Sequence, residues 1–485
     1  MSTRRAVAWT VAGQALFFII QFGGQVVLTR LLSPREVGIY AGGLAVSGAI
    51  ASIQTLGLRN FLIREANLSD RLMATTFTVN AAMSIVLAVS TYFGGDLLSL
   101  FLGDAGVFRV IAVLSLIPVL SIFEFLPGAL MQRNMKFREI TIISLVKAVV
   151  TTGATILFAC IGRSYMSMAW GLLLGTIISA AMTNIIGANY VVFQFRIAEW
   201  RRITEFGVHM MAISGVNQLS SRICDLILGH ILGLPALGLF SRASNIVTLL
   251  WDNIYSAFTR IALADLSNQR RIGDGSIRTG YLKIVSLMTG VLWPAFGGIA
   301  VLSGPLINLI YGPRWAGAAV PLALLSLSAM FLVTITMAWE VFVIAGETGT
   351  QAKFEFVRSI VATILFAAGS FAGMIGAAGS RIVAAVFSQI LYAPHLMRIT
   401  QTTRSDYLPI YARSFAITLA ALAPAFACVA LLGWGSGMSL SWIVVAVLTG
   451  GVAWTAMIYV VSHPLAHELS RAVGVVSGRL FSNVR

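Results

Sequence analysis

Apolar segments, each about as long as a lipid bilayer is thick, follow one another along nearly the whole chain. A helix needs roughly twenty mostly apolar residues to cross the hydrocarbon core of a membrane. Of the 485 residues, 58% are hydrophobic and 11% are charged, whereas a soluble protein carries about 25% charged residues. Because no core surrounded by water could bury so much apolar surface, we predict an all-α polytopic membrane protein.

The apolar pattern predicts about 14 transmembrane helices, not the ten-residue alternation of a β-barrel. No loop is long enough to form a separate soluble domain, and the longest is expected around residues 263–280. Any binding site must therefore lie within the helical bundle. The expected spans cover approximately residues 7–28, 37–58, 74–98, 107–130, 139–161, 166–192, 206–232, 236–262, 281–310, 316–345, 356–376, 378–397, 410–433 and 440–462.

Positively charged residues are distributed unequally between the two expected sides of the membrane. The termini and the even-numbered loops hold 23 of the 33 Lys and Arg residues, whereas the odd-numbered loops, to which we assign Arg381, hold 6. Since Lys and Arg accumulate in cytoplasmic loops, both termini are expected in the cytoplasm. The same bias accounts for the net charge of +15, so no nucleic-acid partner is expected.

One stretch of the sequence is repeated. LTRLLSPREVGIYAGG, residues 28–43, is echoed 200 residues later by LGHILGLPALGLFSRA, residues 228–243, and Gly38 aligns with Gly238. Six expected spans separate the copies, an even number, so the two halves point the same way across the membrane. Parallel repeats of this kind enclose a central site in carriers that work by alternating access.

The repeat divides the chain into two pseudo-symmetric lobes and a C-terminal extension. Residues 1–200 are predicted to form an N-terminal lobe of helices 1–6, and residues 201–400 a C-terminal lobe of helices 7–12. Residues 401–485 hold helices 13–14 and a cytoplasmic tail. Apolar residues at helical spacing among basic ones predict an interfacial helix in this tail.

Three segments carry a family resemblance, and they are RLLSPREVGIYAGGLAV, IQTLGLRNFLIRE and DLILGHILGLPALGLFSRASNIV. On these segments the chain resembles the polysaccharide transporter (Wzx-type) flippase family of the multidrug/oligosaccharidyl-lipid/polysaccharide exporter superfamily. The resemblance extends along essentially the whole chain, with a departure at Ala264, where the second repeat of the family often has proline.

This resemblance implies a flippase that moves an undecaprenyl-diphosphate-linked oligosaccharide from the cytoplasmic to the periplasmic leaflet of a bacterial inner membrane. The glycan would serve exopolysaccharide, capsule or O-antigen synthesis. The implied partners are the lipid-linked oligosaccharide and the bilayer, with the polymerase and chain-length proteins of the same pathway as further candidates.

Polar side chains inside the expected spans are candidates for substrate contacts, because ionisable groups in a membrane are costly unless they are paired or face water. A diphosphate needs cationic partners, and the planar guanidinium of arginine donates two parallel hydrogen bonds to phosphate. Interhelical hydrogen bonds and ion pairs, such as one between Arg222 and Asp225, are the structural alternative. The substrate-binding candidates are Lys147, Arg222, Arg242, Gln14, Gln21, Gln25, Asn217 and Asn245.

Four carboxylates inside the expected spans are candidates for coupling transport to an ion. They are Glu124, Asp225, Asp252 and Glu340. No nucleotide-binding GxxxxGK[ST] motif occurs, so we expect no ATP and no other cofactor, and a proton or sodium gradient is the candidate energy source. The five histidines are scattered, and no metal site is predicted.

Three other functions are weighed against flipping of a lipid-linked oligosaccharide. A drug or metabolite exporter of the same superfamily usually has twelve spans, and helices 13 and 14 therefore argue against it. A lipid II flippase shares the expected number of spans and stays an open alternative. An intramembrane polysaccharide polymerase would need a sizeable external loop with basic or histidine residues, and the external loops here are short, so no enzymatic activity is expected.

Overall fold

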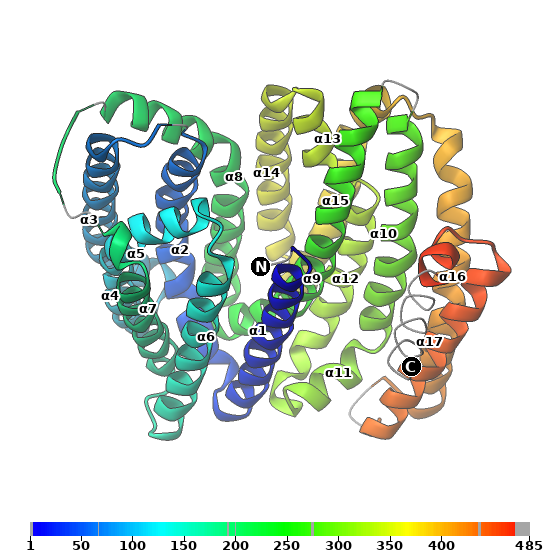
Figure 1. Cartoon of the computed structure of the whole chain (residues 1–485). Coiled ribbons are helices and arrows are strands. Elements are labelled where there is room, and N and C mark those ends of the chain that lie inside the picture. Colours follow the sequence, from blue (N-terminus) through cyan, green and yellow to red (C-terminus); the bar gives the residue numbers. More distant parts are fainter. Residues whose placement is uncertain are drawn as a thin grey trace, which may run out of the picture. The chain divides into compact units, whose positions relative to one another are not determined.

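The computed structural model describes residues 3–65, 67–191, 194–198, 200–272, 276–434 and 438–470, and these residues form helices and loops without any β-strand (Figure 1). Nine helical segments of the described chain are long and apolar enough to cross a membrane. The protein is thus an all-α polytopic membrane protein. It forms two compact units, Met1–Ser241 and Arg242–Arg485.

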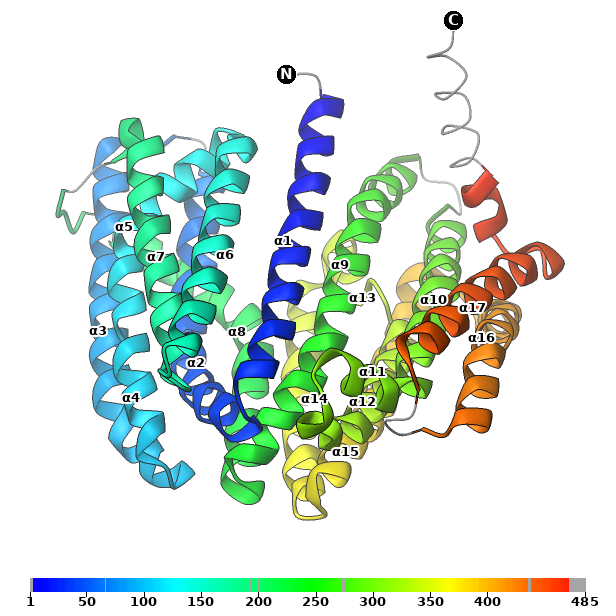
Figure 2. The ribbon, with the colours of Figure 1, turned by 90° about the horizontal axis from the view of Figure 1, so that it is seen from below.

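Unit 1 extends beyond residue 200, the expected end of the first lobe, because α8 packs along α2. Within this unit α3 and α4 run beside each other, and α4 also packs on α7 (Figure 2). The helices of unit 1 are α1 (Thr3–Leu31), α2 (Pro34–Arg64), α3 (Asp70–Leu102), α4 (Ala105–Leu114), α5 (Leu116–Arg133), α6 (Phe137–Cys160), α7 (Met166–Ile186), the short 3-10 helix η1 (Ala188–Tyr190), α8 (Trp200–Leu232) and the first residues of α9 (Leu234–Ile272).

Unit 2 is built around α10, which packs on both α12 and α16, while α15 packs on α12 and α14. The buried faces of α10, α12, α13 and α15 share one hydrophobic core, which includes Phe296, Val333, Phe342 and Tyr392. Its helices after α9 are α10 (Ser276–Val301), α11 (Ser303–Ile310), the 3-10 helix η2 (Pro313–Ala318), α12 (Ala319–Val333), α13 (Ala338–Ala345), α14 (Thr348–Ser370), α15 (Gly373–Thr400), α16 (Arg404–Leu432) and α17 (Leu440–Val460).

One side of α3 shows what faces the membrane. Val86, Phe93, Leu97 and Leu100 follow one another at helical spacing and have 62%, 72%, 72% and 78% of their surface exposed. Such an apolar stripe would be unfavourable in water, whereas hydrocarbon can cover it because all backbone groups of the helix are paired internally.

The first turn of the repeat is held by side chains of two other turns in unit 1. The backbone N–H and the hydroxyl of Ser33 both donate to Glu36 Oε2, at 2.7 and 2.8 Å, and form a capping box at the start of α2. The other carboxylate oxygen of Glu36 accepts a hydrogen bond from Ser164 in the α6–α7 turn. Arg35 pairs with Asp104 of the α3–α4 turn at 3.0 Å. The motif SPRE therefore connects the α1–α2, α3–α4 and α6–α7 turns at one end of this unit.

The two copies of the repeat meet at their glycines. A Cβ atom on Gly38 would lie 1.8 Å from the carbonyl oxygen of Leu234, and one on Gly238 would lie 1.9 Å from the carbonyl oxygen of Pro34. The contact of Gly38 with Leu234 becomes the contact of Gly238 with Pro34 when the two positions are exchanged between the repeats by the shift of 200 residues. The reciprocal contact supports the duplication and explains why both copies carry glycine here, since no other residue lets two backbones approach so closely.

Several expected spans are interrupted, among them the span expected at 107–130, which is divided at Ser115 into α4 and α5. The span expected at 281–310 is divided at Leu302 into α10 and α11, and the span expected at 316–345 consists of η2, α12 and α13. Between α12 and α13, Met337 adopts a left-handed conformation with φ of 59°. Apolar periodicity does not reveal such breaks, because the hydropathy continues through them.

Two expectations about loops are wrong. Residues 263–280 do not form a long loop, because α9 continues to Ile272 and α10 begins at Ser276. Arg381 does not lie in an external loop, because α15 begins at Gly373 and carries Arg381 on its third turn. Of the expected interfacial tail helix, residues 465–470 are helical, and residues 471–485 lie outside the described part.

A buried histidine fastens the segment after α17 to unit 2. The side chain of His463 is 1% exposed, and its Nδ1 accepts a hydrogen bond from the Leu465 N–H at 3.2 Å. Nε2 must then carry the proton of the neutral ring, and it donates to Ser286 Oγ at 3.1 Å. A proton on Nδ1 would therefore break an existing hydrogen bond.

Stability is expected to fall in acid because of this ring. Burial, together with the nearby charge of Arg413, lowers the pKa of His463 from 6.5 to about 4. As the pH falls from 6.5 towards 4, the unfolded chain binds a proton that the folded chain does not, so the free energy of unfolding decreases by at most about 1.4 kcal/mol per pH unit. Thermal unfolding followed across this range should show the loss, and His463→Gln should remove it. An unchanged pH profile in the variant would contradict the assignment. The neighbouring ion pair between Lys283 and Glu468, at 2.8 Å, also holds this segment against α10 and does not depend on the charge of His463.

Candidate functional site

In unit 1, two of the candidate residues pair with each other. Lys147 Nζ on α6 lies 3.8 Å from Glu124 Oε1 on α5, and the charge of Glu124 also interacts with Arg59 on α2. Each charge is partly compensated by the other, and three helices meet at this cluster. The roles predicted for Lys147 in anion binding and for Glu124 in ion coupling stay predictions.

Arg222 and Asp225, one turn apart on α8, also form an ion pair, with 3.6 Å between Arg222 Nη1 and Asp225 Oδ2. The Arg222 side chain lies against α2, where a Cβ on Gly48 would come within 2.8 Å of Nε. Gly48 therefore leaves the room that the guanidinium occupies. Asn217, further towards the start of α8, is exposed.

The polar stripe expected on α1 is visible in part. Gln21 and Gln25 are both half-buried, and Oε1 of Gln25 is buried without a hydrogen-bond donor among the described residues. The side chain of Gln14 lies outside those that the structure describes. The stripe as a whole stays a prediction.

In unit 2, the candidate residues on α9 lie in different surroundings. Arg242 is buried, with 7% of its surface exposed, and interacts electrostatically with Tyr311 at the end of α11. Asn245 is half-buried and Asp252 is exposed. Ten residues of helix, about 15 Å, separate Arg242 from Asp252, so the two do not form one site.

The buried carboxylate of Glu340 is held by a helix break. Glu340 lies in the first turn of α13, directly after the left-handed Met337, and is 4% exposed. The hydroxyl of Tyr255 on α9 lies 2.9 Å from both of its carboxylate oxygens. No Lys or Arg of the described chain forms an ion pair with this carboxylate. The free N–H groups of the helix N-terminus favour a negative charge at this position.

A cavity of about 280 Å³ lies within unit 2 between α9, α12 and α15. Its walls combine apolar residues with the hydroxyl-bearing side chains Ser244 and Thr248 of α9, and with Arg381 of α15. The Arg381 guanidinium lies over the Phe366 ring, 4.4 Å from its centroid, which stabilises its charge. In the part of the chain that the structure describes, no carboxylate pairs with Arg381, so the cavity carries a positive charge within a membrane-spanning helix.

Sequence reasoning missed this cavity for two reasons. The sequence prediction places Arg381 in a loop. On α9 it selects the face with Arg242, Asn245 and Asp252 and not the neighbouring face. Ser244, Thr248, Trp251 and Tyr255 follow one another on that face at spacings of four, three and four residues, and the first three line the cavity while the fourth contacts Glu340. The signal that could have found Arg381 is an arginine with apolar residues on both sides, in AAGSRIVAAVF.

A half-buried polar network that joins α14 and α15 was also not predicted. Arg358 pairs with Glu355, three residues earlier on α14, and Tyr392 of α15 donates to the same carboxylate at 3.2 Å. Gln351 donates to Tyr392 Oη at 3.4 Å. Every charge in this network is compensated, which indicates a role in joining the two helices. Among the described residues, no group of three His, Cys, Asp or Glu side chains could hold a metal ion.

Comparison with known proteins identifies what this arrangement is similar to. The family described as "Polysaccharide biosynthesis protein" matches residues 27–320. The succinoglycan biosynthesis transport protein ExoT of Rhizobium meliloti is 22% identical, over 76% of this chain and 74% of its own length. The lipopolysaccharide biosynthesis protein WzxC of Escherichia coli is 21% identical, over 79% of this chain and 78% of its own length.

Among solved structures, the lipid II flippase MurJ in an inward closed conformation has the same fold. It covers 94% of this chain and 98% of its own, with a TM-score of 0.76 and 14% sequence identity. At that identity the likeness establishes the architecture, and the cargo must be argued from the residues of this chain.

Proposed function

Because the chain belongs to the polysaccharide biosynthesis protein family, we propose that it is a flippase that moves an undecaprenyl-diphosphate-linked oligosaccharide across the bacterial inner membrane by alternating access. The names of the relatives ExoT and WzxC, a transport protein and a biosynthesis protein of two polysaccharides, support this class of cargo. The glycan enters exopolysaccharide, capsule or O-antigen synthesis. The protein itself catalyses no bond change, and both termini lie in the cytoplasm.

The observation that carries the proposal is the uncompensated Arg381 at the cavity of unit 2. An arginine inside a membrane is costly, and a site that binds an anion compensates this cost. Its planar group can donate two parallel hydrogen bonds to a diphosphate or to the carboxylate of an acidic sugar. Ser244 and Thr248 place hydroxyl groups at the same cavity, suited to the hydroxyls of a glycan.

The lipid part of such a cargo needs an apolar path, and unit 2 has an apolar groove that fits this need. The groove has a volume of about 420 Å³ and lies between α10, α16 and α17, with side chains such as Ile299, Leu422 and Val447 along it. Transfer of each methylene group of a polyprenyl chain from water to such a surface is favourable by about 0.8 kcal/mol. We assign this groove to the lipid tail.

Flipping itself tests the proposal. Purified chain reconstituted into vesicles with a lipid-linked oligosaccharide in one leaflet should expose the glycan to a membrane-impermeant probe on the other side. Flipping of lipid II is measured in parallel in vesicles that contain lipid II in place of the lipid-linked oligosaccharide. A deletion strain should accumulate the lipid-linked oligosaccharide facing the cytoplasm. Flipping of lipid II alone would refute the cargo assigned here.

Glu340 is the proposed coupling group, since the Tyr255 hydroxyl links its carboxylate to the helix that carries Arg242. Binding a proton or sodium ion at Glu340 would change this contact and thereby the position of α9. Glu340→Gln, which keeps the shape but loses the charge, is expected to lower flipping driven by an imposed gradient at least about tenfold. Flipping is measured in vesicles with and without a pH or sodium gradient. Equal gradient dependence in the variant and the parent would exclude Glu340, and Tyr255→Phe serves as the variant that removes the contact alone.

A further inference from the structure

A groove on unit 2 that the proposed transport path does not use has the features of a lipid site. It has a volume of about 480 Å³ and lies between the end of α12, the second half of α15 and the first turns of α16. Ile390 and Leu408 form its rim, and 69% and 72% of their surfaces are exposed. Exposed apolar side chains of this size face hydrocarbon in a membrane protein, so the groove opens towards the lipid.

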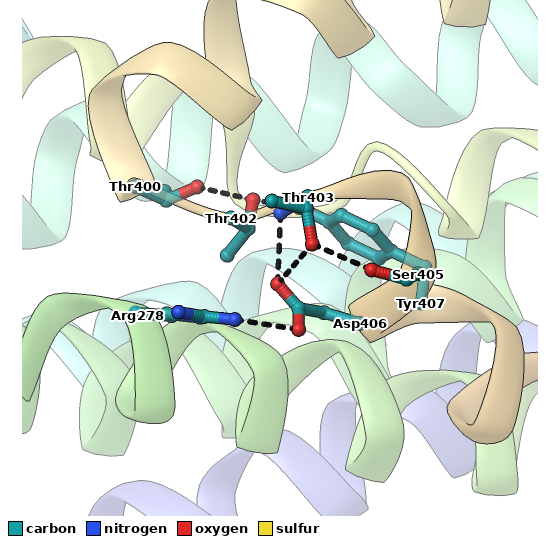
Figure 3. Close-up of polar contacts among 7 residues, drawn as sticks. All are labelled: Arg278, Thr400, Thr402, Thr403, Ser405, Asp406 and Tyr407. Carbon is teal, nitrogen blue, oxygen red and sulfur yellow. Dashed lines mark hydrogen bonds and ion pairs between the residues drawn. The ribbon is translucent and has the colours of Figure 1, made fainter.

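One end of the groove carries a positive charge. Arg404 is the first residue of α16, lines the groove and is exposed. The nearby carboxylate of Asp406 is occupied, because it accepts from Arg278 at 2.7 Å and from the Thr403 backbone at 2.8 Å (Figure 3). No carboxylate of the described residues pairs with Arg404. The charge of this guanidinium is therefore available to a ligand.

The walls at this end are ordered by protein contacts alone. In the α15–α16 turn, Thr400 and Thr402 share a hydrogen bond of 2.9 Å, and Thr402 and Tyr407 one of 2.8 Å (Figure 3). The rings of Tyr407 and Tyr411 are stacked with centroids 5.8 Å apart. A ligand would lose little free energy in ordering this surface, because it is already fixed.

We propose that this groove binds an anionic phospholipid of the bilayer, with the phosphate on Arg404 and an acyl chain along Ile390, Pro394 and Leu408. A basic residue at the end of a span, next to an apolar channel between helices, matches both halves of such a molecule. Tyrosines at the junction match the headgroup level, where their rings are apolar and their hydroxyls polar. A soluble phosphate would use only the charged end, and a neutral lipid only the apolar wall. The site is independent of the transported cargo.

The test measures lipid binding to the full chain in detergent, by native mass spectrometry and by the shift of thermal unfolding. Phosphatidylglycerol is compared with phosphatidylcholine of the same acyl chains and with inorganic phosphate. Phosphatidylglycerol should bind most tightly, and Arg404→Gln should weaken it about fivefold. Arg404→Lys should retain most of the binding. Arg163→Gln, which removes an exposed arginine from the α6–α7 turn of unit 1, is the matched control and should have no effect.

Three results would overturn the lipid assignment. These are equal binding of the two phospholipids, equal losses in Arg404→Gln and Arg163→Gln, and equal protection by inorganic phosphate. Ala393→Phe narrows the groove without changing its charge. It should weaken the binding of phosphatidylglycerol while leaving the structure of the α15–α16 turn intact. Unweakened binding in this variant would place the acyl chain elsewhere. Size-exclusion profiles identify any variant that fails to fold.

Discussion

Replacing Gly38 or Gly238 by alanine is expected to destabilise the protein strongly, although alanine is the better helix former. A new Cβ would come within 1.8 or 1.9 Å of a carbonyl oxygen of the facing turn, and backbone, unlike the end of a long side chain, cannot move aside. Overpacking costs roughly 1–3 kcal/mol or more. It therefore exceeds the gain of up to about 1 kcal/mol that alanine gives in a helix interior.

Gly94 on α3 is the matched control, because nothing lies within 4 Å of a Cβ added there. Gly94→Ala should leave the melting temperature unchanged or raise it, whereas Gly38→Ala and Gly238→Ala should both lower it by several degrees. The reciprocity of the contact adds a sharper condition, since the two variants should have similar effects. If Gly38→Ala melted like Gly94→Ala, the two turns would not be in contact in the stable conformation of the protein.

The fold could be predicted well from the sequence because hydropathy and helical length determine it together. The greater part of each expected span falls on helical structure, and the shift of 200 residues between the repeats reappears in the contact of Gly38 with Gly238. The interruption at Met337 could not be predicted, because left-handed conformation at a methionine has no compositional signal and is imposed by tertiary packing. Helix ends such as Ile272 depend on local contacts and are equally hard to place.

The candidate site was harder to predict than the fold. Which charges form ion pairs depends on how the helices pack, and this packing cannot be inferred from the sequence of a single helix. The ion pair between Lys147 and Glu124, at 3.8 Å, joins two helices and could not be read from either one alone, whereas the pair between Arg222 and Asp225 follows from their spacing on one helix. The count of loop charges includes Arg381 although this residue lies near the start of the span expected at 378–397, and α15 begins even earlier, at Gly373. A charge close to the end of an expected span is easily assigned to the loop beside it, and the half-buried guanidinium of Arg381 was therefore not predicted as part of a site.

Replacing Arg381 is expected to have the largest effect on transport. Arg381→Ala removes the cation of the unit 2 cavity, and flipping of the lipid-linked oligosaccharide should fall about a hundredfold or more, as expected when a charge-assisted contact to an anion is lost. Arg381→Lys keeps the charge but loses the two parallel hydrogen bonds, so it should recover only part of the rate. Initial rates are measured in vesicles of equal protein content.

A structural role for Arg381 predicts a different pattern, because its guanidinium also lies over Phe366. Phe366→Leu removes the ring and keeps the charge, so under anion binding it should transport far better than Arg381→Ala at the same melting temperature. If the two variants lost transport and stability equally, the arginine would act through packing alone. A cargo without acidic sugars separates the two possible anions: a persistent loss in Arg381→Ala assigns the residue to the diphosphate, and a loss confined to acidic glycans assigns it to the sugar carboxylate. Wild-type flipping in Arg381→Ala would remove the cavity from the transport path.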